Sequence, residues 1–395
     1  MKDDKQAEYV SAEEAADLLG VSVPTLYAYV SRKGLRSRAV PGSRKRRYWR
    51  PDLERLARGE GAAAPPEETL RHESAITLIT ENGPYYRGQS AVALAESASF
   101  EDVASLLWEC DAQDVFTADM VRMPGQSQAL AGLLEDYAGV DRATALFLLL
   151  EANDPRSFDL TPQGMARTGA QILRWLAAIL LKQAQPEVMP IQAFVAKVLR
   201  LPGDHADLVR RVLILAADHG FEPAAFAVRA VASTGVTPWR SVATGLTVTT
   251  GRRSKLGRFD AVRRLLVDIV ESRDPSQTIL RRVREGASLP GFGTPMYATS
   301  DPRGKALLAA CARVFENDEE HRRLVTAIQV AREAAKIEPD FNLALMFIAR
   351  KIGLPAWDSL LLVGRSAGWI AHAIEQYAAG ETTHQEGVYK GPLPE

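Results

Sequence analysis

Basic side chains are concentrated in one short stretch near the start of the chain, where they could bind phosphate groups. The 395 residues include 48 Lys and Arg and 49 Asp and Glu, which gives a formal net charge of −1. Residues 31–50, however, hold nine basic residues and no acidic one. Guanidinium and ammonium groups neutralise phosphates and release the counterions of a polyanion. We therefore expect this part of the chain to bind a polyanion, and a solvated basic surface is the alternative.

Two short helices and a hairpin are predicted around this basic stretch. Ser11 and Glu14 have the spacing of a capping box that opens a helix running to Leu19, and Gly20 stops this helix. Ser22 caps a second helix. A hairpin follows around residues 36–50, and then a closing helix over residues 52–59. The predicted core of this small unit consists of Ala15, Leu18, Val21, Leu26 and Val30.

This pattern resembles the winged helix-turn-helix domains of the MerR and excisionase group over roughly the first 60 residues. In that group the second helix enters the major groove and the wing contacts phosphates, which implies that residues 1–60 bind DNA. The resemblance assigns DNA contacts to Thr25, Tyr27, Tyr29, Arg32, Lys33, Arg44, Lys45, Arg46 and Arg47. For Tyr27 and Tyr29, packing in the core of the domain is the alternative.

The remainder of the chain has the composition of a folded, mainly helical protein. Hydrophobic residues make up 46% and charged residues 25%, as in soluble globular domains. The only cysteines, Cys110 and Cys311, exclude a disulfide scaffold and favour the cytoplasm. No apolar run has the length of a membrane span, and we expect neither a signal peptide nor a membrane partner. Apolar residues recur with helical spacing, and ITLI at 76–79 is the best strand candidate.

Five blocks of this remainder, in order, resemble the citrate synthases, enzymes that condense an acyl-CoA with a 2-oxo acid. The resemblance implies an all-α body and an obligate homodimer. It also implies a large domain at 71–254 and 346–395 and a small mobile domain at 255–345. These domains follow the winged helix-turn-helix domain at 1–60 and a linker at 61–70, which its small and Pro-rich composition indicates. The blocks are residues 76–109, 217–235, 289–308, 338–355 and 364–376.

The family chemistry implies roles for several residues of this chain. A carboxylate removes a proton from the methyl group of acetyl-CoA, and Asp340 matches this general base. Arginines and a histidine bind the substrate carboxylates, and His219, Arg303 and Arg365 match these groups. Structural alternatives remain open: Asp340 could cap a helix, His219 could be a core histidine, and the arginines could form structural ion pairs.

The chain departs from the family where two catalytic histidines are expected. Ser254 and Thr294 occupy their positions, and neither side chain matches the near-neutral acidity of imidazole. Losing one such donor typically costs about 10²–10³ in turnover. Glu222 stands where the family has asparagine, and His384 stands where an arginine reaches the partner subunit. The added negative charge of Glu222 weakens the binding of a dicarboxylate such as oxaloacetate.

Two functions from different classes remain open. The first is a metabolite-sensing DNA-binding regulator whose enzyme body is catalytically degenerate. The second is a citrate synthase-type transferase of the tricarboxylic acid cycle with weak or altered activity, or a non-catalytic subunit that pairs with a complete paralogue. We expect no bound cofactor. Acetyl-CoA or another acyl-CoA, and a 2-oxo acid or another small anion, are the expected substrates or ligands. No metal site is expected, because His72, His205 and His372 lack metal-ligand spacing.

Overall fold

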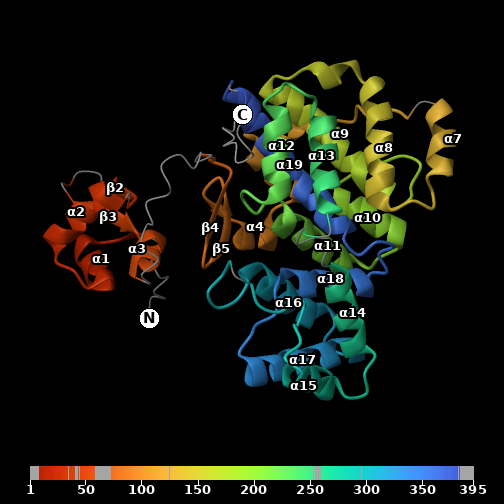
Figure 1. Cartoon of the computed structure of the whole chain (residues 1–395). Helices are drawn as coiled ribbons and strands as arrows, with labels where there is room; N and C mark the ends of the chain where they lie inside the picture. The colour runs from red at the N-terminus through yellow and green to blue at the C-terminus, as the bar shows by residue number, and fades with distance from the viewer. Residues whose placement is uncertain are drawn as a thin grey trace, which may run out of the picture. The chain divides into compact units, whose positions relative to one another are not determined.

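The chain folds into two compact units, Met1–Glu73 and Ser74–Glu395, which we call the head and the body (Figure 1). The computed structural model describes residues 9–33, 35–40, 43, 45–57, 73–123, 125–251, 253, 259–294, 296–380 and 382.

The head combines short helices with a three-stranded antiparallel sheet of order β1-β3-β2. The predicted capping box is confirmed: the Glu14 amide donates to Ser11 Oγ at 3.1 Å, and the Ser11 amide donates to Glu14 Oε2 at 2.8 Å. Gly20 ends the helix with a left-handed φ of 62°, as predicted. The elements are β1 (Tyr9–Val10), α1 (Ala12–Leu19), α2 (Val23–Lys33), β2 (Ser37–Ala39), β3 (Arg46–Trp49) and α3 (Arg50–Ala57).

The head has its own small apolar core. Ala15 and Leu26 are buried as predicted, and Val21 and Val30 pack against them. Leu18, predicted to lie in this core, is instead 37% exposed, because α1 turns Ala15 and Ala16 inward. The buried set is Val10, Ala15, Leu26, Leu35, Tyr48 and Leu53.

The described part of the body is helical apart from a small antiparallel sheet of order β4-β5-β6, so the predicted all-α class is confirmed. The strand candidate at 76–79 corresponds to β4 (Thr77–Thr80), which pairs with β5 (Gly83–Tyr86). The remaining elements are β6 (Gln89–Ser90), α4 (Ala91–Ser97), α5 (Phe100–Trp108), α6 (Ala112–Val115), α7 (Gly125–Leu133), α8 (Gly139–Ala152), η1 (Pro155–Phe158), α9 (Pro162–Leu180), α10 (Ile191–Leu199), α11 (Gly203–Ala216), α12 (Pro223–Ala232), α13 (Pro238–Thr249), α14 (Phe259–Val270), α15 (Pro275–Arg284), α16 (Pro302–Val314), α17 (Glu319–Ala335), α18 (Phe341–Lys351) and α19 (Ser359–Ala378).

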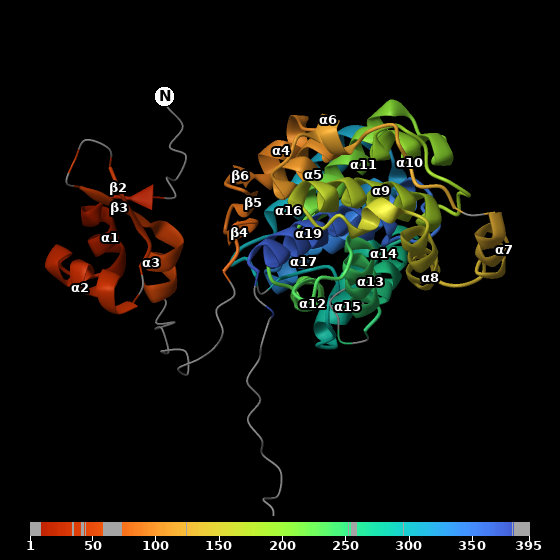
Figure 2. The ribbon, with the colours of Figure 1, turned by 90° about the horizontal axis from the view of Figure 1, so that it is seen from above.

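Helix α19 is the centre of the body. It is buried along most of its length and lies between α9 and α11 on one side and α12 and α13 on the other (Figure 2). A Cβ atom on Gly364 or Gly368 would come within 2.6 Å or 2.4 Å of a carbonyl oxygen at the end of α11. Glycine at both positions therefore lets α19 pack directly on α11. This contact places Arg365 beside the connection from α11 to α12.

Helices α14 to α18 pack against one another in the lower part of Figure 1. Gly304 of α16 permits the close approach of α18, because a Cβ there would lie 2.6 Å from the carbonyl carbon of Asp340. That the segment 255–345 moves as a separate small domain stays a prediction. Within the described residues, no helix has both the length and the apolar character that a membrane span requires.

Candidate functional site

Asp340 is the N-cap of α18, which confirms the structural alternative given for it. Its Oδ1 accepts hydrogen bonds from the amides of Asn342 at 2.8 Å and Leu343 at 3.1 Å. Burial nevertheless raises the pKa of Asp340 to about 6, and the negative charge of Asp301 adds to this rise. A carboxyl group with this pKa can accept a proton near neutral pH. The cap and a role as general base are therefore compatible.

The loop that contains Thr294 is joined to the segment that contains Asp340. The Gly293 amide donates to the Glu338 carbonyl at 2.7 Å, and the Asp340 amide donates to the Gly291 carbonyl at 2.9 Å. These bonds place Thr294 close to α18. The Thr294 hydroxyl accepts from the Met296 amide at 3.2 Å and so stabilises the turn of its own loop.

Arg303, at the start of α16, forms a buried bidentate ion pair. Its Nε and Nη2 lie 3.1 Å and 2.8 Å from the two carboxylate oxygens of Asp301. The guanidinium carbon lies 4.7 Å from the centre of the Phe341 ring. Asp301 Oδ2 also accepts from the Phe341 amide at 3.3 Å. Arg303 thus joins α16 to the N-terminus of α18 close to Asp340.

His219 lies in the connection between α11 and α12 and contacts a residue that the sequence analysis did not identify. Its Nε2 is 2.8 Å from the hydroxyl of Tyr297. Burial raises the pKa of Tyr297 to about 12, so this phenol is protonated at neutral pH and can donate to the imidazole. The sequence could have indicated Tyr297 as a site residue, because it lies three residues after Thr294 in the block 289–308.

Arg365 is bound to a carboxylate of its own chain. Its Nε donates to the Ala216 carbonyl at 2.8 Å, and its Nη1 lies 3.1 Å from Glu222 Oε1. The same oxygen accepts from Trp369 Nε1 at 3.1 Å. Glu222 occupies the N-cap position of α12, yet its side chain makes no capping bond. Its carboxylate is therefore directed to α19 and not to its own helix.

These groups share one electrostatic environment. The positive charges of both Arg303 and Arg365 act on Tyr297, the partner of His219, and on the buried Tyr86. The structure therefore brings together four of the predicted site residues, His219, Arg303, Arg365 and Asp340, the last through its contacts with the Asp301 segment. Ser254 and His384 lie outside the described residues.

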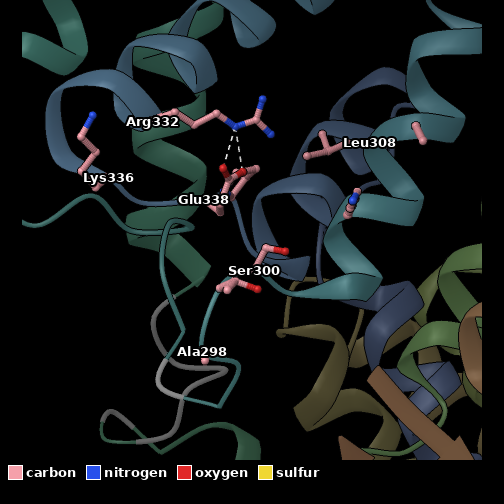
Figure 3. Close-up of a pocket in the computed structure, with 10 residues that line it drawn as sticks. Ala298, Ser300, Leu308, Arg332, Lys336 and Glu338 are labelled. Atoms are coloured by element: carbon pink, nitrogen blue, oxygen red, sulfur yellow. Dashed lines mark hydrogen bonds and ion pairs between the residues drawn. The ribbon is translucent and has the colours of Figure 1, made fainter. Parts of the chain in front are cut away.

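A pocket of about 720 Å³ is lined by residues of α16 and α17 and by Glu338, two positions before Asp340 in the chain (Figure 3). Lys305 and Lys336 contribute exposed ammonium groups, while Arg332 pairs with Glu338 at 2.8 Å. Pro339, which precedes Asp340, forms part of the wall. The basic lining can bind an anionic group such as a phosphate. The pocket was not predicted, because Lys305 of α16 and Lys336, the C-cap of α17, lie far apart in the chain.

The hairpin of the head, β2 and β3 with the residues between them, is called the wing here. Lys45, Arg46 and Arg47 are exposed, and Arg46 Nε donates to Ser37 Oγ at 3.0 Å. Arg38 lies directly opposite Arg47 in the strand register. Within the described part of the chain, no carboxylate lies within ion-pair distance of these four side chains. Arg38 was missed in the sequence analysis, although it lies in the same basic stretch.

The other candidate DNA contacts differ in exposure. On α2, Thr25 is exposed with its hydroxyl 2.8 Å from that of Ser22, and Tyr27 is 55% exposed. Tyr29 is half-buried and packs against the core of the head. Arg44 and the side chains of Arg32 and Lys33 lie outside the described residues.

Comparison with known families decides the nature of the body. The family model for the citrate synthase C-terminal domain matches residues 66–384. The chain belongs to the citrate synthase family. A second family model, for a helix-turn-helix domain, matches residues 9–60. The chain therefore joins a helix-turn-helix domain to a citrate synthase domain, as the sequence analysis predicted.

Individual relatives agree with this assignment. The chain is 28% identical over 200 residues to putative citrate synthase 2 of Mycobacterium tuberculosis. This match spans 48% of the chain and about half, 52%, of the length of that relative. It is 25% identical to citrate synthase of Haloferax volcanii over 82% of the chain and 94% of the relative. The citrate synthase of Thermoplasma acidophilum, solved with carboxymethyl coenzyme A and oxaloacetate, has the same fold. It aligns with a TM-score of 0.69 at 18% identity over 83% of this chain and 96% of its own.

Proposed function

We propose that the protein is a DNA-binding regulator whose citrate synthase body binds a small anion and an acyl-CoA as signals. The observation that carries this proposal is the exposed basic wing of the head, in which Arg38 and Arg47 face each other. The guanidinium carbon of Arg38 lies 4.0 Å from the centre of the Tyr9 ring, on the same face of the sheet as Arg47. A phosphate bound by these two arginines would release counterions.

The position of α2 supports the same proposal. Thr25 and Tyr27 are exposed on this helix, which is the second helix of the helix-turn-helix unit. In such units the second helix supplies the side chains that contact base edges. The wing would then bind the phosphate backbone while α2 contacts the major groove.

Degenerate catalysis in the body is supported by the residues that stand in the family's histidine positions. The chain has no histidine between His219 and His321. Thr294 uses its hydroxyl within its own loop, and a threonine cannot exchange a proton near pH 7 as imidazole does. A loss of about 10³ or more in turnover is expected when both histidines are absent.

A citrate synthase-type transferase is the second candidate function, and the pKa of Asp340 favours it. A carboxyl group with a pKa of about 6, one position after a residue that lines a basic pocket, has the properties of a general base near a bound acyl-CoA. The titration of Asp340 alone does not replace the two histidines, so we place this function second.

The assembly follows from the same proposal. A cytoplasmic homodimer would carry two heads, which suits a pseudo-palindromic DNA site. Pairing with a complete paralogue is the alternative. Ligand binding between the large domain and a mobile small domain at 255–345 would change the spacing of the heads and so the affinity for DNA.

The experiment that tests the proposed function selects DNA with the full-length protein from a random duplex library. Enrichment of a defined sequence, with an affinity that changes when acetyl-CoA and a 2-oxo acid are added, is the expected result. No enrichment, together with release of CoA thiol from acetyl-CoA and oxaloacetate that disappears in Asp340→Ala, would establish the transferase instead.

A further inference from the structure

We propose that Glu222 determines the ligand class of the body, because its carboxylate occupies Arg365 in place of a ligand carboxylate. The site then accepts a 2-oxo acid with one carboxylate and rejects a 2-oxo acid with two. This inference rests on the proposed binding of a 2-oxo acid or similar anion by the body.

The Glu222 carboxylate is bound by two side-chain donors, as the carboxylate of a ligand would be. Its Oε1 lies 3.1 Å from Arg365 Nη1 and 3.1 Å from Trp369 Nε1, two donors one turn apart on α19. The Arg365 side chain is only 7% exposed, while that of Glu222 is 22% exposed. The guanidinium is thus deeply buried, and the carboxylate bound to it is the more exposed of the two groups.

The charge balance of the site leaves little attraction for a second anionic group. Arg303 already holds Asp301 through two hydrogen bonds, and Arg365 holds Glu222. A ligand carboxylate at Arg365 would have to approach the Glu222 carboxylate or displace it. Repulsion between like charges is strong where water is largely excluded. A ligand with an alkyl group at this end would avoid that repulsion.

A purely structural ion pair between α12 and α19 would explain the same contact, and the body contains a matched pair for comparison. Arg229 of α12 binds Glu375 of α19, with side chains 7% and 20% exposed. The two pairs join the same helices with nearly the same burial. Removal of either carboxylate should therefore affect stability to a similar extent, whereas only Glu222 should affect ligand selectivity.

The test compares 2-oxobutyrate with oxaloacetate, which have the same chain length and differ in a methyl group against a carboxylate. Calorimetric titration of the full-length protein, free of DNA and with EDTA, gives both dissociation constants. We expect the wild type to bind 2-oxobutyrate at least about tenfold more tightly. Glu222→Gln should reduce this preference by about tenfold or more, since it removes the charge and keeps the shape.

The control variant is Glu375→Gln, which should leave the preference of the wild type unchanged. The proposal is overturned if the wild type prefers oxaloacetate, if it binds neither acid, or if both variants alter the preference equally. The preference of the wild type decides the matter should Glu222→Gln fail to fold. DNA binding is measured on the same preparations, so a failure of the head does not affect the result for Glu222.

Discussion

Arg38 of β2 and Arg47 of β3 lie directly opposite each other in the wing of the head. Residues paired in this way have their side chains on the same face of the sheet, and the Arg38 guanidinium carbon lies 4.0 Å from the centre of the Tyr9 ring. The ion pairs of the described head involve other arginines: Arg36 with Asp52 and Arg50 with Glu54. Neither Arg38 nor Arg47 has a carboxylate partner among the described residues, so both positive charges are available to a phosphate.

Replacing both Arg38 and Arg47 by glutamine should weaken DNA binding at every sequence. Each phosphate contact contributes about 0.9 to the slope of log affinity against log salt, so the slope should fall by about 2. The free energy of unfolding of the head should change by less than about 1 kcal/mol, because removing two like charges and losing the contact of Arg38 with the Tyr9 ring have opposite effects. Fluorescence anisotropy at several salt concentrations measures the slope.

The matched control replaces Arg167 and Arg322, two exposed arginines of the body, by glutamine. This variant has the same net charge as the wing variant and should bind DNA like the wild type. An equal loss of affinity in both variants would show that the wing has no special role.

Tyr27 and Tyr29 should respond differently to alanine. Tyr27 is largely exposed, so Tyr27→Ala should reduce DNA affinity and change the free energy of unfolding by less than about 0.5 kcal/mol. Tyr29 packs against the core, so Tyr29→Ala should destabilise the head by about 1–3 kcal/mol. Thermal unfolding and DNA binding of both variants check this. Equal destabilisation by the two substitutions would contradict the assigned burial.

The raised pKa of Asp340 predicts a pH-dependent stability. The folded state holds the proton more tightly than the unfolded state, so the folded state loses stability as the pH rises from about 4 to above 6. Asp340→Asn keeps an oxygen that can cap α18 and carries no charge. It should stabilise the body by about 2–3 kcal/mol at pH 8 and have little effect at pH 4. Urea unfolding at both pH values measures the difference, and a constant difference would refute the raised pKa.

Restoring imidazole should increase condensation. Thr294 lies in a loop that is hydrogen-bonded to the Asp340 segment, so a histidine there would lie near the proposed base. The double substitution Ser254→His and Thr294→His should raise thiol release from acetyl-CoA with 2-oxobutyrate by about 10²-fold or more. Adding Asp340→Ala should abolish the gain. No increase would mean that the pocket no longer holds both substrates in a reactive arrangement.

The local features of the head could be predicted from the sequence, because they depend on neighbouring residues. The capping box of Ser11 and Glu14 and the stop at Gly20 are set by spacings of a few residues. The prediction that Leu18 lies in the core was wrong, since the short helix α1 contacts the core through Ala15 and Ala16 and leaves Leu18 exposed.

The contacts of the candidate site could not be predicted, because they join residues far apart in the chain. His219 and Tyr297 are 78 positions apart, and Glu222 and Trp369 are 147 positions apart. The family resemblance identified His219 and Arg365 singly. The resemblance could not predict that the Glu222 side chain leaves its own helix to bind Arg365. That contact depends on how α19 packs against α12.

The measurement that tests the central claim most directly is the selection of duplex DNA from a random library by the full-length protein. We predict a pseudo-palindromic sequence whose affinity falls steeply with salt and falls further in the variant with Arg38→Gln and Arg47→Gln. Recovery of no sequence above the background, with equal weak binding by the wild type and the wing variant, would contradict the claim that this protein regulates through DNA.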